Sequence, residues 1–192
     1  MDPRRSITTD DGVHHVLKQS PTSWDRRIAA DLVAEIEPYI GKLETLPELR
    51  QQLAIDGYRG LTRRIEHAVV GVTGTDAIVA MAQAMRGYAI ARPGLAAASF
   101  RSLDVTSPEW QAAGAELAQT VMEVLASCGL HGAAASHAAL ILRCLVRGFI
   151  VNEMTTPNSS LDFHESFAVA IRTFVHGLPE LQRIASSETV LG

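Results

Sequence analysis

The chain has 192 residues, of which 47% are apolar and 20% are charged, and a formal net charge of −4. It can bury a substantial core, and its length fits one domain or a small head fused to one domain. No apolar run reaches the roughly 18 residues that cross a bilayer, and no signal segment follows Met1, so we expect a soluble cytoplasmic protein. The acidic balance excludes a global attraction for nucleic acid, so any DNA binding requires a local basic surface.

The N-terminal part contains an ambiguous helical segment. Few aromatic residues, abundant alanine and apolar stripes at spacings of three and four predict an all-helical protein. Residues 24–37 are consistent with one continuous helix, which Pro38 would end. Residues 31–37 contain no glycine, the residue that usually allows a tight turn between two helices. One continuous helix and a helix-turn-helix both remain open for this segment.

A long helix is predicted from Leu46 to about Val69, with a break at residues 71–74. Gly57 lies on its apolar stripe and leaves room for a close neighbour. The next helix begins near Thr75 and ends before Pro93, because glycine and proline follow. A short helix is expected over residues 95–100.

Three further helices are expected in the C-terminal half. Thr106 is predicted to cap the first of them, and Gly129 follows its end. The second covers residues 131–154 and is apolar nearly all round, so it must be buried on more than one side. The last begins at Phe163 and is predicted to stop at residues 177–179, which include glycine and proline.

The last two helices carry more apolar surface than one subunit needs. A symmetric dimer buries such a patch against its own copy. We therefore predict a homodimer joined by a four-helix bundle. The interface is predicted to include Leu145, Phe163, Phe167, Ile171 and Phe174.

An ordered set of motifs in the C-terminal half resembles the TetR family of transcriptional regulators. In chain order the set comprises Arg92-Pro93-Gly94-Leu95, Leu145-Val146-Arg147-Gly148-Phe149-Ile150, Phe163-His164-Glu165-Ser166-Phe167 and His176-Gly177-Leu178. The resemblance covers about residues 46–178. It implies an all-α dimer of about nine helices with a small-molecule pocket in each body. It also implies a ligand-responsive repressor that releases operator DNA when its ligand binds.

The resemblance divides the chain into a head, residues 1–45, and a ligand-binding and dimerisation body, residues 46–192. The head would hold three short helices, of which the last two form a helix-turn-helix. Residues 28–32 resemble the family's second helix, and residues 39–43 take the place of the segment just before the body. The DNA-binding residues are predicted to be Arg26, Arg27, Tyr39 and Lys42.

The charge of the N-terminal part favours an alternative. The first 50 residues hold seven Lys and Arg against nine Asp and Glu, a net charge of −2. A head that neutralises several phosphates should be basic. The family also has a glycine-containing turn where this chain has residues 33–38. Loss of DNA binding therefore stands as the alternative to a working head.

The body is predicted to bind a small apolar molecule. Ligand pockets combine aromatic and flexible apolar walls with a few polar groups, although ordinary core positions are the alternative for each residue. The predicted lining residues are Met81, Met85, Tyr88, Phe100, Trp110, Met122, His137 and Phe149. Arg143 and Arg147 either reach the surface or pair with an acid, and one of them could hold an anionic ligand.

The sequence contains no pattern of a metal site, a cofactor site or a catalytic centre. Its histidines lack metal-ligand spacing, and Cys128 and Cys144 are expected to be buried free thiols. No nucleophile triad order or phosphate-binding glycine loop is present. An enzyme would need a pocket acid or base, for which His67, Glu116 and His137 are the candidates.

Two other functions compete with a DNA-binding regulator. The first is a TetR-like scaffold that has lost DNA binding and acts as a small-molecule-binding protein or a cavity-based enzyme. The acidic, glycine-free residues 31–37 favour it. The second is an interaction partner that dimerises with intact regulators and weakens their DNA binding. A membrane partner is not expected in any of these functions.

Overall fold

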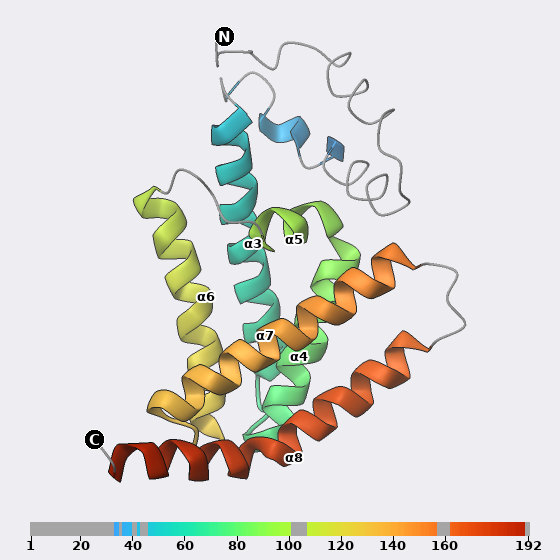
Figure 1. The fold of residues 1–192 in the computed structure, drawn as a ribbon. Helices are drawn as coiled ribbons and strands as arrows, with labels where there is room; N and C mark the ends of the chain where they lie inside the picture. The colour runs from blue at the N-terminus through green and yellow to red at the C-terminus, as the bar shows by residue number, and fades with distance from the viewer. Residues whose placement is uncertain are drawn as a thin grey trace.

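The computed structural model describes residues 33–34, 36–39, 42, 46–100, 107–156 and 162–190. Every element in these ranges is helical, which confirms the predicted all-α fold (Figure 1). The helices predicted within residues 1–32 lie outside the described residues. In chain order the elements are η1 (Glu37–Tyr39), α3 (Leu46–Val69), α4 (Gly74–Ala91), α5 (Pro93–Phe100), α6 (Pro108–Ser127), α7 (Gly132–Thr155) and α8 (Phe163–Val190).

Helix α3 is the spine against which α4, α5 and α6 pack (Figure 1). Gly57 lies on its inner side, as the sequence predicts. A Cβ at this position would lie 2.8 Å from the carbonyl oxygen of Leu95 in α5. Glycine therefore allows the backbones of α3 and α5 to approach closely. The buried residues of the α3 stripe are Leu49, Leu53, Leu61 and Ile65.

Helix α7 is a core helix that packs against α4, α6 and α8. By length and composition it is long and apolar enough to cross a membrane. In this fold one side of α7 is buried, whereas the opposite side exposes Leu140, Ile141 and Val151. The helix is therefore apolar on two sides but buried on one side in the single chain, so the expected burial on more than one side stays a prediction. Its buried residues are Ala134, Ala135, Ala138, Leu142, Val146, Ile150 and Met154.

Helix α8 is longer than the sequence predicts. It continues through Pro179 to Val190, so the predicted stop at this proline is wrong. A proline removes one backbone hydrogen bond and bends a helix, but tertiary packing can compensate for that loss. Leu178 is buried in the core, and Gln182 Nε2 donates to the Gly129 carbonyl oxygen at 3.0 Å. These contacts hold the end of α8 against the turn between α6 and α7.

The start and end of α6 follow local backbone chemistry. The helix ends where Gly129 adopts a φ angle of 78°, as predicted from the glycine. Its N-cap is Ser107, whose side chain accepts a hydrogen bond from the backbone N–H of Trp110 at 3.1 Å. The predicted cap, Thr106, lies outside the described residues. The correct cap is thus one residue later, immediately before Pro108.

Candidate functional site

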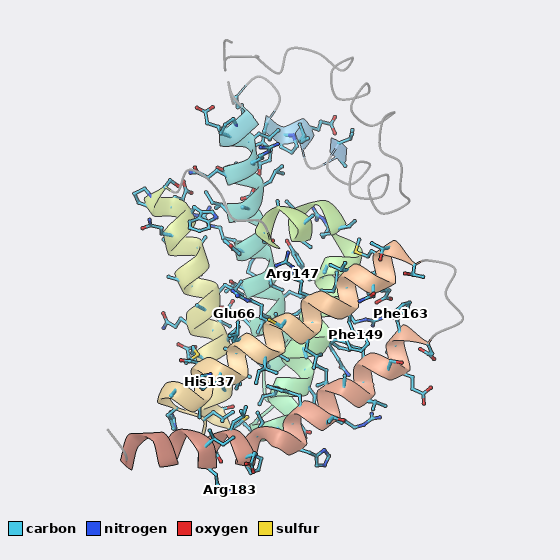
Figure 2. All side chains as sticks on the ribbon, viewed as in Figure 1. Glu66, His137, Arg147, Phe149, Phe163 and Arg183 are labelled. Carbon is cyan, nitrogen blue, oxygen red and sulfur yellow. The ribbon has the colours of Figure 1, made fainter. Side chains whose placement is uncertain are left out.

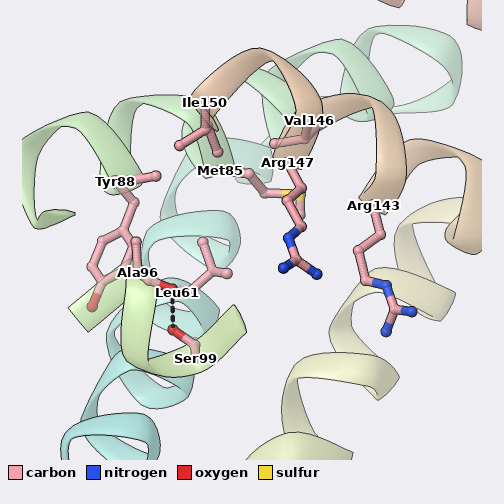
Figure 3. A pocket seen from close by; sticks show the side chains of 10 residues that line it. Leu61, Met85, Tyr88, Ala96, Ser99, Arg143, Val146, Arg147 and Ile150 are labelled. Atoms are coloured by element: carbon pink, nitrogen blue, oxygen red, sulfur yellow. Dashed lines mark hydrogen bonds between the residues drawn. The ribbon is translucent and has the colours of Figure 1, made fainter. Parts of the chain in front are cut away.

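The candidate site is a small cavity enclosed by α3, α4, α5 and α7 (Figure 3). Its volume is about 20 Å³, which is the scale of a single water molecule. The walls are almost wholly apolar, so the cavity suits a hydrocarbon group. The lining residues are Leu61, Met85, Tyr88, Ala89, Ala96, Ser99, Arg143, Val146, Arg147 and Ile150.

Small residues on α3 and α5 create the space. A Cβ at Gly60 would lie 3.0 Å from Cζ of Tyr88, so glycine makes room for the tyrosine ring beside α3. A Cβ at Gly57 would lie 2.7 Å from Ser99 Oγ. Ala96 and Ser99 form the wall on the α5 side. Because protein interiors are close-packed, larger residues at these positions would fill the cavity or force the helices apart.

Hydrogen bonds of Ser99 and Tyr58 order this wall, and one of them joins α3 to α5. Ser99 Oγ donates to the carbonyl oxygens of Leu95 at 2.6 Å and Ala96 at 3.3 Å, the second of which is drawn in Figure 3. The Tyr58 hydroxyl donates to the Ser99 carbonyl oxygen at 3.2 Å. Burial raises the pKa of Tyr58, so its hydroxyl remains a donor at neutral pH. The nearby positive charge of Arg143 opposes part of that rise in the pKa.

Two arginines of α7 flank the cavity. Arg143 and Arg147 are one helical turn apart and exposed, and their guanidinium groups extend to the same side of α7 (Figure 3). Within the described part of the chain, no acidic side chain forms an ion pair with Arg143. Arg143 therefore places a positive charge beside the apolar cavity.

Helix α5 lines the cavity with one of its sides and packs against residues that precede α3 with another. Ala96 and Ser99 line the cavity. Leu95 and Ala98 belong to a separate apolar group, which we call the N-terminal cluster and which consists of Ile36, Tyr39, Leu49, Leu53, Leu95 and Ala98. A short helix of eight residues thus lies between the candidate cavity and Ile36 and Tyr39, which belong to the end of the predicted head.

Two of the ligand-binding residues predicted from the sequence line this cavity, namely Met85 and Tyr88. Met81 is fully buried in the main core, and Met122 is half-buried against the same core. The side chain of Phe100 lies outside the described residues.

The other three predicted ligand-binding residues lie away from the cavity. Trp110 packs beside Tyr58 with 6.1 Å between ring centroids, and its indole N–H is buried without a hydrogen-bond partner in the described part of the chain. Phe149 packs edge-on against Phe167, with ring centroids 5.4 Å apart. His137 is exposed near the start of α7 (Figure 2). Their proposed contact with a ligand stays a prediction.

Sequence reasoning did not select most of the apolar lining residues. Small residues such as Ala96 and Ser99 carry no sequence pattern that separates a cavity wall from an ordinary helix contact. Val146 and Ile150 are four residues apart and share one side of α7, but so do ordinary core residues. The omitted lining residues without charge are Leu61, Ala89, Ala96, Ser99, Val146 and Ile150.

The residues predicted for the dimer interface are largely internal to one subunit. Phe167, Ile171 and Phe174 are 2%, 1% and 8% exposed and belong to the main core. Leu145 and Phe163 are half-buried (Figure 2 labels Phe163). The exposed large apolar residues of the two helices are Leu140, Ile141, Val151, Val169 and Ile184.

Two of the four residues predicted for DNA binding belong to the described residues, and the other two do not. Arg26 and Arg27 lie outside the described residues. Tyr39 is half-buried in the N-terminal cluster, and Lys42 is exposed. The backbone N–H of Lys42 donates to the Tyr39 carbonyl oxygen at 2.9 Å, which turns the chain just before α3.

The candidate acid and base residues do not meet at the cavity. His67 and Glu116 are exposed on α3 and α6, like His137 on α7. In the described part of the chain, no group of three His, Cys, Asp or Glu side chains is arranged to hold a metal ion. Cys128 is half-buried, and burial raises the pKa of its thiol. Cys144 is exposed, in contrast to the prediction, because it lies on the outward side of α7.

The helical body and its comparisons with known proteins define a regulator body of the tetracycline-repressor type. The family model described as "Tetracyclin repressor-like, C-terminal domain" matches residues 78–174. A relative from Mycobacterium tuberculosis is named "Uncharacterized HTH-type transcriptional regulator Rv0681". It is 31% identical over 160 residues, which cover 81% of this chain and 73% of the relative. The chain belongs to the TetR family of transcriptional regulators.

Proposed function

We propose that this protein is a homodimeric, cytoplasmic repressor that leaves its operator DNA when a small, mainly apolar molecule enters the cavity. The observation that carries the proposal is the position of α5. Its Ala96 and Ser99 side lines the cavity, and its Leu95 and Ala98 side supports the N-terminal cluster. A ligand that displaces α5 therefore alters the support of the segment that leads to the DNA-binding head.

The small volume of the cavity supports this coupling. A pocket for a drug-sized ligand requires roughly 300 Å³ or more, whereas this cavity has about 20 Å³. The ligand must therefore separate α5 or α7 from α3. A ligand that binds only the separated arrangement shifts the population towards it, and a shift from 1:99 to 99:1 needs about 5.5 kcal/mol of differential affinity.

The dimer is proposed to form through the outward sides of α7 and α8. Leu140, Ile141 and Val151 lie opposite the buried stripe of α7, and Val169 is exposed on α8. A Cβ at Gly148 would meet no heavy atom within 4 Å, so a partner helix has room to approach there. A symmetric pairing of these sides would bury apolar surface that one subunit leaves in water.

The head, residues 1–45, is proposed to contact DNA through Arg26, Arg27 and Lys42. Tyr39 has a different role in this proposal, because it is half-buried against the body. It would transmit the position of α5 to the head. The basic side chains would form the local positive surface that an acidic chain needs in order to bind phosphates.

The test is a titration of fluorescent duplex DNA from around the protein's own coding region, at low and at physiological salt. We expect sequence-dependent binding that persists at physiological salt. Replacing Arg26 and Arg27 with alanine should weaken binding and reduce the salt slope by about 4, because the dimer loses four phosphate contacts and each contributes about 0.9. Arg64→Ala, exposed on α3 and outside the proposed dimer interface, is the matched control and should bind like the wild type.

A small-molecule-binding protein without DNA binding is the second candidate, and the net acidic first 50 residues favour it. Absence of binding to any duplex at either salt would support this candidate and contradict the repressor. Among the described residues that line the cavity there is no His, Asp or Glu, so this alternative concerns binding and not acid-base catalysis.

A further inference from the structure

Polar contacts hold the first turn of α6 against α3. Gln51 Nε2 donates to the hydroxyl oxygen of Ser107, and Arg59 donates to a carboxylate oxygen of Glu109 at 3.0 Å. Trp110 follows in the same turn, and its backbone N–H donates to Ser107 Oγ at 3.1 Å. These contacts fix the backbone that carries the Trp110 side chain.

The indole of Trp110 carries a hydrogen-bond donor that has no acceptor in the described part of the chain. The ring packs beside that of Tyr58, with 6.1 Å between the centroids, and its Nε1 atom is buried. An indole N–H can only donate, and buried donors in native proteins are nearly always paired. Burial without an acceptor costs stability, so each such donor requires a reason. A ligand that brings the acceptor is such a reason.

Tyr58 connects this donor to the cavity. Its hydroxyl donates to the carbonyl oxygen of Ser99 at 3.2 Å, and Ser99 lines the cavity (Figure 3). Burial raises the pKa of Tyr58, and the charge of Arg143, another lining residue, opposes that rise, so Arg143 lies near the same ring. A cavity that widens where α5 meets α3 therefore opens towards Tyr58 and Trp110.

The surroundings of Trp110 disfavour a charged ligand group. Arg59 is already paired with Glu109. Asp56 lies near this pair, and burial raises the pKa of its carboxyl group although Arg59 and Arg63 act to lower it. A site that destabilises the charge of its own carboxylate also disfavours an anion, and a cationic ammonium group offers no acceptor to the indole. An uncharged acceptor is the group that fits.

We propose that the ligand carries an uncharged hydrogen-bond acceptor, such as a carbonyl oxygen, which binds the indole N–H of Trp110 while its apolar part occupies the widened cavity. This inference rests on the proposed function, since it names the ligand class of the same cavity. The ligand pairs a donor that has no acceptor among the described residues, so no printed hydrogen bond of Trp110 is lost on binding. The contacts of Gln51 and Arg59 hold the indole in place beforehand, which reduces the entropy that binding costs.

The experiment is an NMR titration of the full-length protein, with an isotopic nitrogen label in its tryptophan side chains. The probes are 2-octanone, 2-methyl-1-octene and heptanoate, which share one hexyl chain. The alkene has a methylene group in place of the carbonyl oxygen, and heptanoate carries a negative charge. We expect 2-octanone to move the indole proton signal of Trp110 downfield, as a hydrogen bond does, and the alkene to leave it nearly unchanged. The chain has two tryptophans, so Trp24→Phe identifies the signal of Trp110.

A variant assigns the preference to the donor. Trp110→Phe keeps an aromatic ring and removes the N–H. It should weaken 2-octanone binding about three- to tenfold, the range of one hydrogen bond, and change alkene binding less than about twofold. Comparing both probes on both proteins cancels the different solubility of the probes in water. Trp24→Phe is the matched control and should keep the wild-type affinities.

Circular dichroism checks that each variant is folded. If Trp110→Phe does not fold, the indole signal of the wild-type protein decides the outcome. Equal weakening of 2-octanone and the alkene by Trp110→Phe would overturn the inference, because the ring would then contribute packing alone. Tighter binding of heptanoate than of 2-octanone would overturn it as well, and so would absence of 2-octanone binding.

DNA binding is measured on the same samples, which separates this inference from the repressor function. Binding of 2-octanone that moves the Trp110 signal without release of DNA would support the uncharged acceptor and contradict the repressor. Release of DNA by 2-octanone and the alkene alike, with the Trp110 signal unmoved, would support the repressor and overturn the acceptor.

Discussion

The α7–α8 side and the α3–α5 side of the body are built from different residues. Large side chains fill the space between α7 and α8, where Met154, Phe167 and Ile171 are at most 2% exposed. Between α3 and α5, next to the leucines of the N-terminal cluster, Gly57 and Ser99 allow backbone atoms to lie close together. The first arrangement buries much apolar area, whereas the second depends on the absence of side chains.

An ion pair between α4 and α7 adds to the contacts on the α7–α8 side. Arg86 of α4 donates to both carboxylate oxygens of Glu153 in α7, at 2.9 and 2.7 Å. These two side chains are only 14% and 24% exposed. The Arg86 guanidinium carbon also lies 5.4 Å from the ring centroid of Phe167 in α8, within the range of a cation–π contact. The α7–α8 side thus holds the largest buried contacts, and the coupling that we propose would reside on the α3–α5 side.

The largest expected effect is on the α7–α8 side. Phe167→Ala removes a buried aromatic ring that contacts Phe149 and should reduce the free energy of unfolding by about 3–5 kcal/mol. Val70→Ala, at a side chain that is 77% exposed after the end of α3, should change it by less than about 0.5 kcal/mol. Chemical denaturation measures both values, and similar losses in the two variants would contradict the burial of Phe167 in the core.

The ion pair should give the next largest effect. Glu153→Ala leaves a poorly solvated Arg86 without its carboxylate, and we expect a loss of about 2 kcal/mol of stability. The exposed pair of Arg59 and Glu109 provides the control, since Glu109→Ala should cost less than about 1 kcal/mol. Equal losses in thermal denaturation would show that burial does not strengthen the Arg86 pair.

The α3–α5 contact should respond to one methyl group. Gly57→Ala places a Cβ 2.8 Å from a backbone oxygen of α5, so the helices must separate, at a cost of about 1–2 kcal/mol and with weaker DNA binding. Gly87→Ala in α4 meets no heavy atom within 4 Å and should gain up to about 1 kcal/mol from helix propensity. A gain of stability in both variants would mean that α3 and α5 do not require the close approach.

The smallest effect on the subunit itself is expected at the outward side of α7. Ile141 is 42% exposed, so Ile141→Glu should leave the helical content unchanged while it gives monomers in light scattering. Gln119→Glu, exposed on α6, is the control and should remain dimeric. An unchanged dimer for Ile141→Glu would place the interface elsewhere.

The sequence predicts the helices of the body well because each has a clear apolar stripe and a chemical start or stop. The exception is Pro179, where the rule that proline ends a helix is outweighed by the contacts of Leu178 and Gln182. Those contacts join segments about fifty residues apart. A local pattern contains no information about them.

The candidate site is much harder to predict from sequence. The stripe that contains Phe167 and Phe174 fits a core and a dimer interface equally well, because both are apolar, and only the packing places it inside. The cavity wall depends on Ala96 and Ser99, which look like ordinary helix residues. An aromatic ring with a hydroxyl group makes Tyr88 a candidate from the sequence, whereas Gly60, the glycine that makes room for this ring, carries no such signal.

The coupling between cavity and head has one direct test: the DNA affinity of Ala96→Leu. This variant fills a cavity of about 20 Å³ from the α5 side, and so mimics a bound ligand. Ala115→Phe, exposed on α6, is the control. We predict that Ala96→Leu stays folded and dimeric and binds operator DNA at least tenfold more weakly than the wild type and the control. Unchanged DNA affinity in a folded Ala96→Leu dimer would contradict the role of α5 as the link between cavity and head.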